Sequence, residues 1–408
     1  MNGTLLTGGF GGAPANSDLV RNENAMNLPF PLYRPRGPVM IDVAGTALTD
    51  EERESLLDPL VGGVILFARN FSASDQLCAL TREIRTLRDP ALIIAVDHEG
   101  GRVQRFRSEG FTRLPSMCSL GALWEQDHLG ALEAAQATGF VLASELRAHG
   151  VDLSFAPVLD LDYRLCSAIG SRAFHRDPQT VAALAQALVA GMARAGMGAV
   201  GKHFPGHGGV EADSHHAVPL DERDFDTVWN EDMAPYRHRL GRQLAAVMPA
   251  HVIYPRADPS AEPQPAGFSA FWLKEVLRDR LGFKGVIFSD DLNMEGARVA
   301  GDIVGRAKAA YGAGCDMLLV CNRPDLVAEL LDRWAPIPDR DKLARLAAIV
   351  PATPAPPWLT DPFALELHAA YVHARERVAA IPDDSGSTPS MTAATIGEQR
   401  TERLPRNG

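Results

Sequence analysis

The sequence predicts an α/β fold, a (β/α)8 barrel of the TIM type built as a single domain. Eight short apolar runs of strand length recur along the chain, and a segment of helix length follows each of them. The runs are continuously apolar, which is typical of parallel strands covered on both faces, and strand–helix alternation is typical of right-handed parallel crossovers. An open doubly wound sheet is the alternative, but it usually has fewer strands and often carries a Gly-rich turn that is missing here.

The eight predicted strands are residues 38–45, 62–68, 91–99, 151–161, 196–204, 244–254, 284–292 and 315–322. Among the predicted helices, residues 129–150 are apolar at helical spacing and end at Gly150, a residue that readily adopts the left-handed conformation of a helix stop. This helix would return the chain to the start of the fourth strand.

The two ends of the chain differ in composition from the part between them. Residues 1–36 are rich in Gly, Asn and Pro, and residues 384–408 are short, polar and turn-forming. Both are predicted to be disordered, because neither has the apolar content to join a core. The barrel domain is therefore expected over residues 37–383.

Charge and cysteine usage limit the possible partners. The net charge of −11, without any run of basic residues, argues against a nucleic-acid or membrane partner. The five cysteines are scattered and form no Cys-x-x-Cys pair, so neither a disulfide framework nor a zinc ribbon is expected. No signal peptide or membrane span is recognisable. We expect a cytoplasmic monomer that acts on a small molecule.

Charged and imidazole side chains mark five consecutive predicted strands, mostly where each strand ends. They are Asp97, His98 and Glu99, then Asp160 and Asp162, then Lys202 and His203, then His251, and finally Asp290 and Asp291. Any one of them could be an ordinary solvated group. In a closed parallel barrel, however, the carboxyl ends of the strands form the active-site rim, so together they predict one site.

The loop after the fifth strand, within "KHFPGHGGVEADSHH" (residues 202–216), is long for a segment without secondary structure, which is uncommon unless it has a function. Its glycines, Gly206, Gly208 and Gly209, allow close approach to a ligand. Its imidazoles and carboxylates could bind zinc, although no spacing typical of a helical zinc site is present. The glycine order of a phosphate-binding loop is also missing. One side of a catalytic pocket is favoured, and a metal site remains the alternative.

These motifs carry a resemblance to a known family. "KHFPGHGGVEADSH" (202–215) and "GVIFSDDLNMEGA" (285–297) are similar to the signature loop and the nucleophile strand of family 3 glycoside hydrolases, in the β-N-acetylglucosaminidase branch. "AVDHEGGRVQRF" (95–106), "FAPVLDL" (155–161) and "GSRAF" (170–174) match it as well. One position departs, because the family often has Asp-Gln-Glu where this chain has Asp97-His98-Glu99.

The resemblance implies a retaining β-N-acetylhexosaminidase that removes N-acetylglucosamine from peptidoglycan fragments and needs no metal or other cofactor. It implies Asp290 as the nucleophile, His215 as the general acid/base and Asp213 as the partner of that histidine. The implied sugar contacts are Asp97, Arg105, Arg172, Lys202 and His203.

Three other functions stay open at this point. A β-N-acetylglucosaminide phosphorylase would use the same loop, because a histidine repels incoming phosphate less than a glutamate does. A metal-dependent hydrolase would use the histidines as ligands, and a non-catalytic barrel would bind sugar without turnover.

Overall fold

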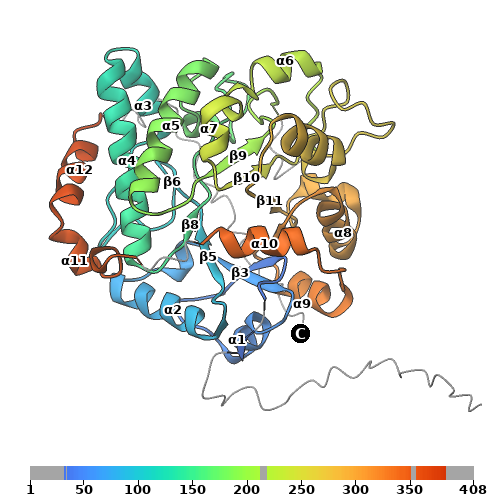
Figure 1. Ribbon diagram of the computed structural model, residues 1–408, viewed down its shortest axis with the longest axis horizontal. Helices are drawn as coiled ribbons and strands as arrows, with labels where there is room; N and C mark the ends of the chain where they lie inside the picture. The colour runs from blue at the N-terminus through green and yellow to red at the C-terminus, as the bar shows by residue number, and fades with distance from the viewer. Residues whose placement is uncertain (1–31, 34, 212–217, 351–354, 383–408) are drawn as a thin grey trace, which may run out of the picture.

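The computed structural model describes residues 32–33, 35–211, 218–350 and 355–382. Eight parallel strands form one sheet in the order β8-β5-β3-β2-β12-β11-β10-β9, as the eight apolar runs predict (Figure 1). Their bounds are β2 Val39–Asp42, β3 Val61–Leu66, β5 Ile93–Val96, β8 Leu153–Ser154, β9 Val200–Phe204, β10 Ala246–Pro249, β11 Val286–Asp291 and β12 Met317–Val320.

The two end strands of this sheet meet, so the sheet closes into a barrel. Isolated parallel bridges join Ser154 to Ala199 and Val158 to Lys202, and the Leu159 N–H donates to the Lys202 carbonyl at 2.6 Å. β8 is shorter than the predicted run 151–161, since Pro157 has no N–H to continue a regular ladder. The closed ring excludes the open doubly wound sheet.

Helices return the chain between the strands and surround the barrel. They are α1 Asp50–Leu56, α2 Ser74–Thr86, α3 Met117–Trp124, α4 His128–Ala148, α5 Pro178–Arg194, α6 Phe225–Asn230, α7 His238–Gln243, α8 Ile303–Ala313, α9 Pro324–Arg333, α10 Arg340–Ala348, α11 Pro362–Glu366 and α12 Ala369–Ala379. A π-helix, η6 (Phe271–Arg280), lies between β10 and β11, and η3 (Gly170–Arg172) is a short 3₁₀ turn. α4 confirms the helix predicted over 129–150, and Gly150 beyond it has a φ of +80°.

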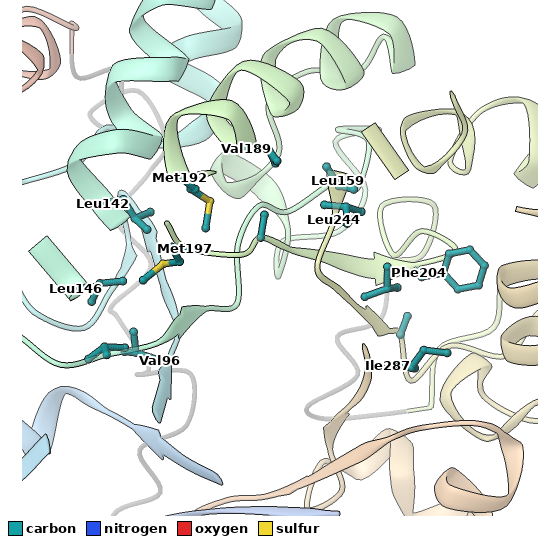
Figure 2. Close-up of a cluster of buried hydrophobic side chains, with 14 of the residues drawn as sticks. Val96, Leu142, Leu146, Leu159, Val189, Met192, Met197, Phe204, Leu244 and Ile287 are labelled. Carbon is teal, nitrogen blue, oxygen red and sulfur yellow. The ribbon is translucent and has the colours of Figure 1, made fainter. Parts of the chain in front are cut away.

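The hydrophobic core has two layers, one inside the barrel and one between the barrel and its helices. The outer layer includes Leu142 and Leu146 from α4, Val189 and Met192 from α5, and Ile287 from β11 (Figure 2). The inner layer consists mainly of alternate residues of the strands, together with Leu346 from α10 and Ile349 directly after it. In Figure 1, α10 lies over the middle of the strand ring.

The chain before β2 also contacts the barrel. β1 (Leu32–Tyr33) pairs in parallel with β4 (Arg88–Asp89), and Arg36 donates to the carbonyls of Ala91 and Leu346 at 2.8 and 3.1 Å. These residues fall inside the 1–36 segment that the sequence predicts to be disordered, so contact with the barrel begins before residue 37. Residues 1–31 and 383–408 lie outside the described residues.

Within the described residues, no helix combines the length and the apolar composition that a bilayer span requires.

Candidate active site

The interior of the barrel changes from apolar to charged at the carboxyl ends of its strands. In β11, Val286 and Phe288 belong to the inner core layer, and because side chains alternate along a strand, Asp290 is the next residue on that face. The same alternation places Asp42, Asp97 and Lys202 at the mouth of the barrel, because each lies two residues after an inner-layer residue of β2, β5 or β9.

Lys202 is the centre of an ion-paired cluster at this mouth. Its Nζ lies 2.8 Å from Asp97 Oδ1 and 2.7 Å from Glu99 Oε1. Glu99 also accepts two hydrogen bonds from Arg172, with Nε to Oε2 at 2.9 Å and Nη2 to Oε1 at 2.8 Å. The side chains of Lys202 and Glu99 are only 3% and 2% exposed, so two cations share one buried carboxylate. Such paired geometry is what a buried charge requires.

The charges in this cluster stabilise one another against burial. Burial opposes ionisation of Glu99 and Asp97, but the neighbouring cations outweigh it and lower the pKa of both carboxyls. Burial likewise opposes the charged forms of Lys202 and Arg172, and the carboxylates raise the pKa of both. All four groups are therefore ionised at neutral pH.

Arg105 approaches the same cluster from the β6–β7 hairpin (β6 His98–Gly100, β7 Val103–Gln104). Its Nη2 is 3.7 Å from Asp97 Oδ2, and its guanidinium carbon lies 5.6 Å from the centre of the Phe67 ring. Asp97, at 24% exposed, is the most accessible carboxylate of the group, so its oxygens are the ones that face the open mouth.

His203 is held by Asp160 on the fourth-strand side of the barrel. The His203 Nδ1 lies 2.7 Å from Asp160 Oδ2, and the His207 backbone N–H donates to Asp160 Oδ1 at 2.7 Å. The two imidazole rings are 5.9 Å apart, edge to face. Burial and then the nearby His203 lower the pKa of His207 to about 4, so that ring is neutral.

Adjacent carboxyls at the end of β11 have different surroundings. Asp291 Oδ1 accepts from the backbone N–H groups of Asn293 at 2.9 Å and Cys321 at 3.1 Å, which fixes it to the chain. Burial raises the pKa of Asp291 to about 7, and the charges of Asp290 and Asp42 act in the same direction. Asp290 Oδ1 accepts from the Asp291 N–H at 2.8 Å.

Three residues of the predicted rim contact the protein rather than the ion-paired cluster. His98 is fully buried among Phe106 and Phe111, with ring centres 5.8 and 5.6 Å away, because it faces opposite to Asp97. Asp162 accepts from the Arg164 N–H in a local turn. His251 Nε2 lies 3.2 Å from the Asp291 carbonyl, so it contacts the backbone at the carboxyl end of β11.

The glycines of the loop after β9 approach the protein rather than an open space. A β-carbon at Gly208 would lie 2.0 Å from the Leu161 carbonyl oxygen, and one at Gly209 would lie 2.3 Å from Arg223 Nη2. The loop therefore needs glycine to lie flat on its neighbours. Asp213 and His215 lie outside the described residues. Of the loop side chains that could bind zinc (His203, His207, Asp213, His215 and His216), only His203 and His207 are described. Within the described residues, no three His, Cys, Asp or Glu side chains form a group that could hold a metal ion.

Sequence reasoning missed one ionic group at the mouth. Asp42, at the end of β2, forms an ion pair with Arg69, and its Oδ1 accepts from the Asn322 N–H at 3.0 Å. Arg69 Nη1 also donates to Asn322 Oδ1 at 2.9 Å. The signal was available, since Asp42 is the one charged residue within the first apolar run (38–45) and Arg69 directly follows the second (62–68). Sequence reasoning did not include these two strand ends in the rim.

Comparison with known proteins shows the family of this chain. The model of the glycosyl hydrolase family 3 N-terminal domain matches residues 37–337. A protein of Aromatoleum aromaticum named β-hexosaminidase is 68% identical over 352 residues, which is 86% of this chain and 97% of that one. A β-hexosaminidase of Bordetella parapertussis is 58% identical over 341 residues, 84% of this chain and 94% of that one.

Solved structures give the same result. The crystal structure of native NagZ from Neisseria gonorrhoeae matches with a TM-score of 0.79 and 51% identity over 86% of this chain and 99% of that one. NagZ from the same organism in complex with N-trifluoroacetyl-D-glucosamine matches with a TM-score of 0.78 and 50% identity, over the same 86% and 99%. The chain therefore belongs to glycosyl hydrolase family 3, and it is a glycoside hydrolase of the β-hexosaminidase type.

Proposed function

We propose that the protein is a retaining β-N-acetylhexosaminidase that removes non-reducing terminal β-1,4-linked N-acetylglucosamine from peptidoglycan fragments of the anhydro-muropeptide type. The observation that carries the proposal is the barrel mouth. There the strand face of Asp290 opens onto the same end of the barrel as the buried cluster of Lys202, Glu99 and Arg172. The identity of 68% to a relative named β-hexosaminidase supports the reaction class.

In the proposed first step, an Asp290 oxygen attacks the anomeric carbon and the bond from that carbon to the leaving oxygen breaks. His215 gives its proton to the leaving oxygen. In the second step, water attacks the anomeric carbon, its proton returns to His215, and the bond to Asp290 breaks. Histidine suits both steps because its pKa is near neutral, and Asp213, two residues away, would orient the ring and favour its charged form.

The proposed sugar contacts are the groups already fixed at the mouth. They are Asp97, Arg105, Arg172, Lys202 and His203. Because their partners hold them before substrate arrives, little side-chain entropy remains to be lost on binding. An ionised Asp97 accepts from sugar hydroxyls, whereas the cations donate to hydroxyls or to the acetamide carbonyl.

The choice of an N-acylated glucosamine is supported by a relative, since NagZ from Neisseria gonorrhoeae has been crystallised with N-trifluoroacetyl-D-glucosamine. We propose that the protein acts as a cytoplasmic monomer without a cofactor.

Incubation with purified anhydro-muropeptide tests the proposal. Mass analysis should find free N-acetylglucosamine and the shortened fragment in both phosphate and phosphate-free buffer, with and without a strong chelator. N-acetylglucosamine 1-phosphate as the product would identify a phosphorylase, and loss of turnover with the chelator would identify a metal-dependent hydrolase. Intact substrate alongside turnover of an aryl N-acetylglucosaminide would overturn only the choice of aglycone.

A further inference from the structure

We infer that Asp160 is a positioning residue of the active site, which selects the tautomer of His203 and anchors the start of the loop after β9. The inference rests on the proposed function, because His203 is one of the proposed sugar contacts. Asp160 itself faces protein donors and has no part in the proposed chemistry.

The Asp160 carboxylate collects three donors in the barrel wall. It accepts from His203 Nδ1 at 2.7 Å, from the His207 N–H at 2.7 Å, and from the His203 N–H at 3.2 and 3.3 Å. Its side chain is 0% exposed. Burial opposes its ionisation, but His203 and the other donors outweigh burial and lower the pKa of Asp160.

The position of this carboxylate follows from the closure of the barrel. Val158 bridges to Lys202, and the Leu159 N–H donates to the Lys202 carbonyl at 2.6 Å, so the chain segments of Asp160 and His203 run side by side. His203 is one residue beyond Lys202, which pairs with Asp97 and Glu99. Asp160 therefore fixes the imidazole of the residue that directly follows Lys202.

An ionised carboxylate can only accept hydrogen bonds, so the proton of a neutral His203 ring must be on Nδ1. Nε2 is then an acceptor, available to a sugar hydroxyl. Without the carboxylate the two tautomers are free to exchange, and the ring would present an acceptor only part of the time. The tautomer is therefore the property through which Asp160 acts on binding.

The same carboxylate fixes the first turn of the loop. The His207 N–H bond to Asp160 lies between two other fixed points, the Gly206 carbonyl, which accepts from Tyr254 Oη at 2.6 Å, and Gly208, which lies against the Leu161 carbonyl. The loop thus leaves β9 in a defined direction. Loss of the Asp160 bond should loosen this start without disturbing Lys202.

Asp160→Asn is the variant that tests the tautomer. The Asn carboxamide oxygen can still accept from the His207 N–H, but its NH₂ group would then face His203 Nδ1. To accept a hydrogen bond from that NH₂ group, the His203 ring must carry its proton on Nε2 instead of Nδ1. Spectra of ¹⁵N-histidine-labelled protein, with His203 assigned from a His203→Gln variant, should show Nδ1–H in the wild type and lose that tautomer in Asp160→Asn.

Kinetics on an aryl N-acetylglucosaminide supply the second readout. Asp160→Asn should lower kcat/KM about tenfold or more, the effect of losing a hydrogen bond to a charged group, mostly through KM. In the His203→Ala background, Asp160→Asn should lower kcat/KM by no more than about threefold further, since both substitutions act through the same imidazole ring. Asp160→Glu, which keeps an acceptor, should recover part of the loss.

Asp316→Asn is the matched control. Asp316 is another fully buried aspartate, accepting from the Ile287 N–H at 2.8 Å and from Arg278 and Arg345, and it lies before β12 at the opposite end of the barrel. The Asp316→Asn variant should lower the melting temperature about as much as Asp160→Asn does. It should leave kcat/KM within about twofold of the wild-type value, because the site is remote from the substrate.

The possible outcomes separate the two proposals. An Nε2–H ring in the wild type, an unchanged His203 spectrum in Asp160→Asn, or equal kinetic losses in both aspartate variants overturns the inference. If Asp160→Asn does not fold, the wild-type tautomer and the Asp160→Glu kinetics still decide it. A wild type with the Nδ1–H tautomer but no glycosidase activity overturns the proposed function instead.

Discussion

Among single residues, Asp290 and Asp291 show how a strand gives two identical side chains different roles. Asp291 is held by the N–H groups of Cys321 and Asn293, whereas Asp290 shares the face of Val286 and Phe288. We predict that Asp290→Asn abolishes turnover of an aryl N-acetylglucosaminide without loss of folding, and that Asp291→Asn keeps measurable activity. Circular dichroism and steady-state rates check both. The opposite ranking would mean that the nucleophile is misassigned.

The reaction step that requires His215 should depend on the leaving group of the substrate. With a very acidic phenol as the leaving group, His215→Ala should complete the first step, because such a phenol leaves without being protonated. The variant should stall in the second step, because the attacking water still needs a general base. We predict a burst of phenol, a slow steady state, and a sugar adduct on Asp290 in the intact-protein mass.

Asp213→Ala should show a milder form of the same behaviour, since the imidazole remains but is less well oriented. Uniform slowing of all substrates without a burst would leave His215 with a binding role only. Glu99 would not then be a convincing replacement, because Lys202 and Arg172 occupy it.

His98 should make stability depend on pH. Within the described part of the chain neither of its ring nitrogens has a hydrogen-bond partner, and burial lowers the pKa of His98 to about 3. The unfolded ring titrates near 6.5 and binds protons first, so the free energy of unfolding should fall as pH drops from 6.5 toward 3.

We predict that His98→Leu removes about 2 kcal/mol of this loss between pH 7 and pH 5 and leaves kcat/KM unchanged. Urea denaturation at the two pH values measures it. A variant with the same pH slope as the wild type would show that the slope comes from other groups.

At the scale of elements, the contact between α4 and α12 contains an unusual carboxyl group. Glu145 accepts from Tyr371 Oη at 2.8 Å and from the Thr112 N–H at 3.0 Å, and burial raises the pKa of Glu145 to about 7. Because the folded pKa exceeds that of the unfolded chain, the stability present below pH 4.5 is lost as pH rises toward 7.

Glu145→Gln keeps the acceptor oxygen and removes the charge. We predict that it raises the free energy of unfolding by about 2 kcal/mol at pH 8 and by much less at pH 5. Glu133→Gln is the control on the same helix, because Glu133 is 51% exposed in its ion pair with Arg377 and should change stability by less than about 1 kcal/mol. Equal gains at both pH values would contradict the prediction.

Elements with a strong pattern were predictable from the sequence, and contacts between distant segments were not. The eight apolar runs became the eight strands, and the helix before Gly150 was correct. The bridge from Glu99 to Arg172 joins residues 73 positions apart, and no local pattern encodes it. The sequence alone could not decide whether Asp290 or Asp291 faces the interior of the barrel. That depends on the register of β11, because a shift of one residue would turn Asp291 inward instead.

For the whole molecule, the two ends of the chain should be dispensable up to a sharp limit. We predict that deleting residues 1–30 and 385–408 leaves turnover unchanged and the melting temperature within a few degrees, because both segments are poor in apolar residues. Extending the N-terminal deletion through residue 36 should lower the melting temperature clearly, since it removes β1 and the Arg36 bonds to Ala91 and Leu346. A large drop for the shorter deletion would show that a terminal segment contacts the barrel.

The pairing of the first barrel strand with the last has a consequence for synthesis of the protein. β2 is bonded to β12, with Met40 opposite Leu319, so one edge of β2 has no native neighbour until the ribosome has nearly finished the chain. At the usual rates of translation the intervening residues take on the order of tens of seconds to make. An apolar edge left open for that time can pair with other nascent chains. Chaperones that cover newly made chains should therefore affect the yield of this protein more than its final stability.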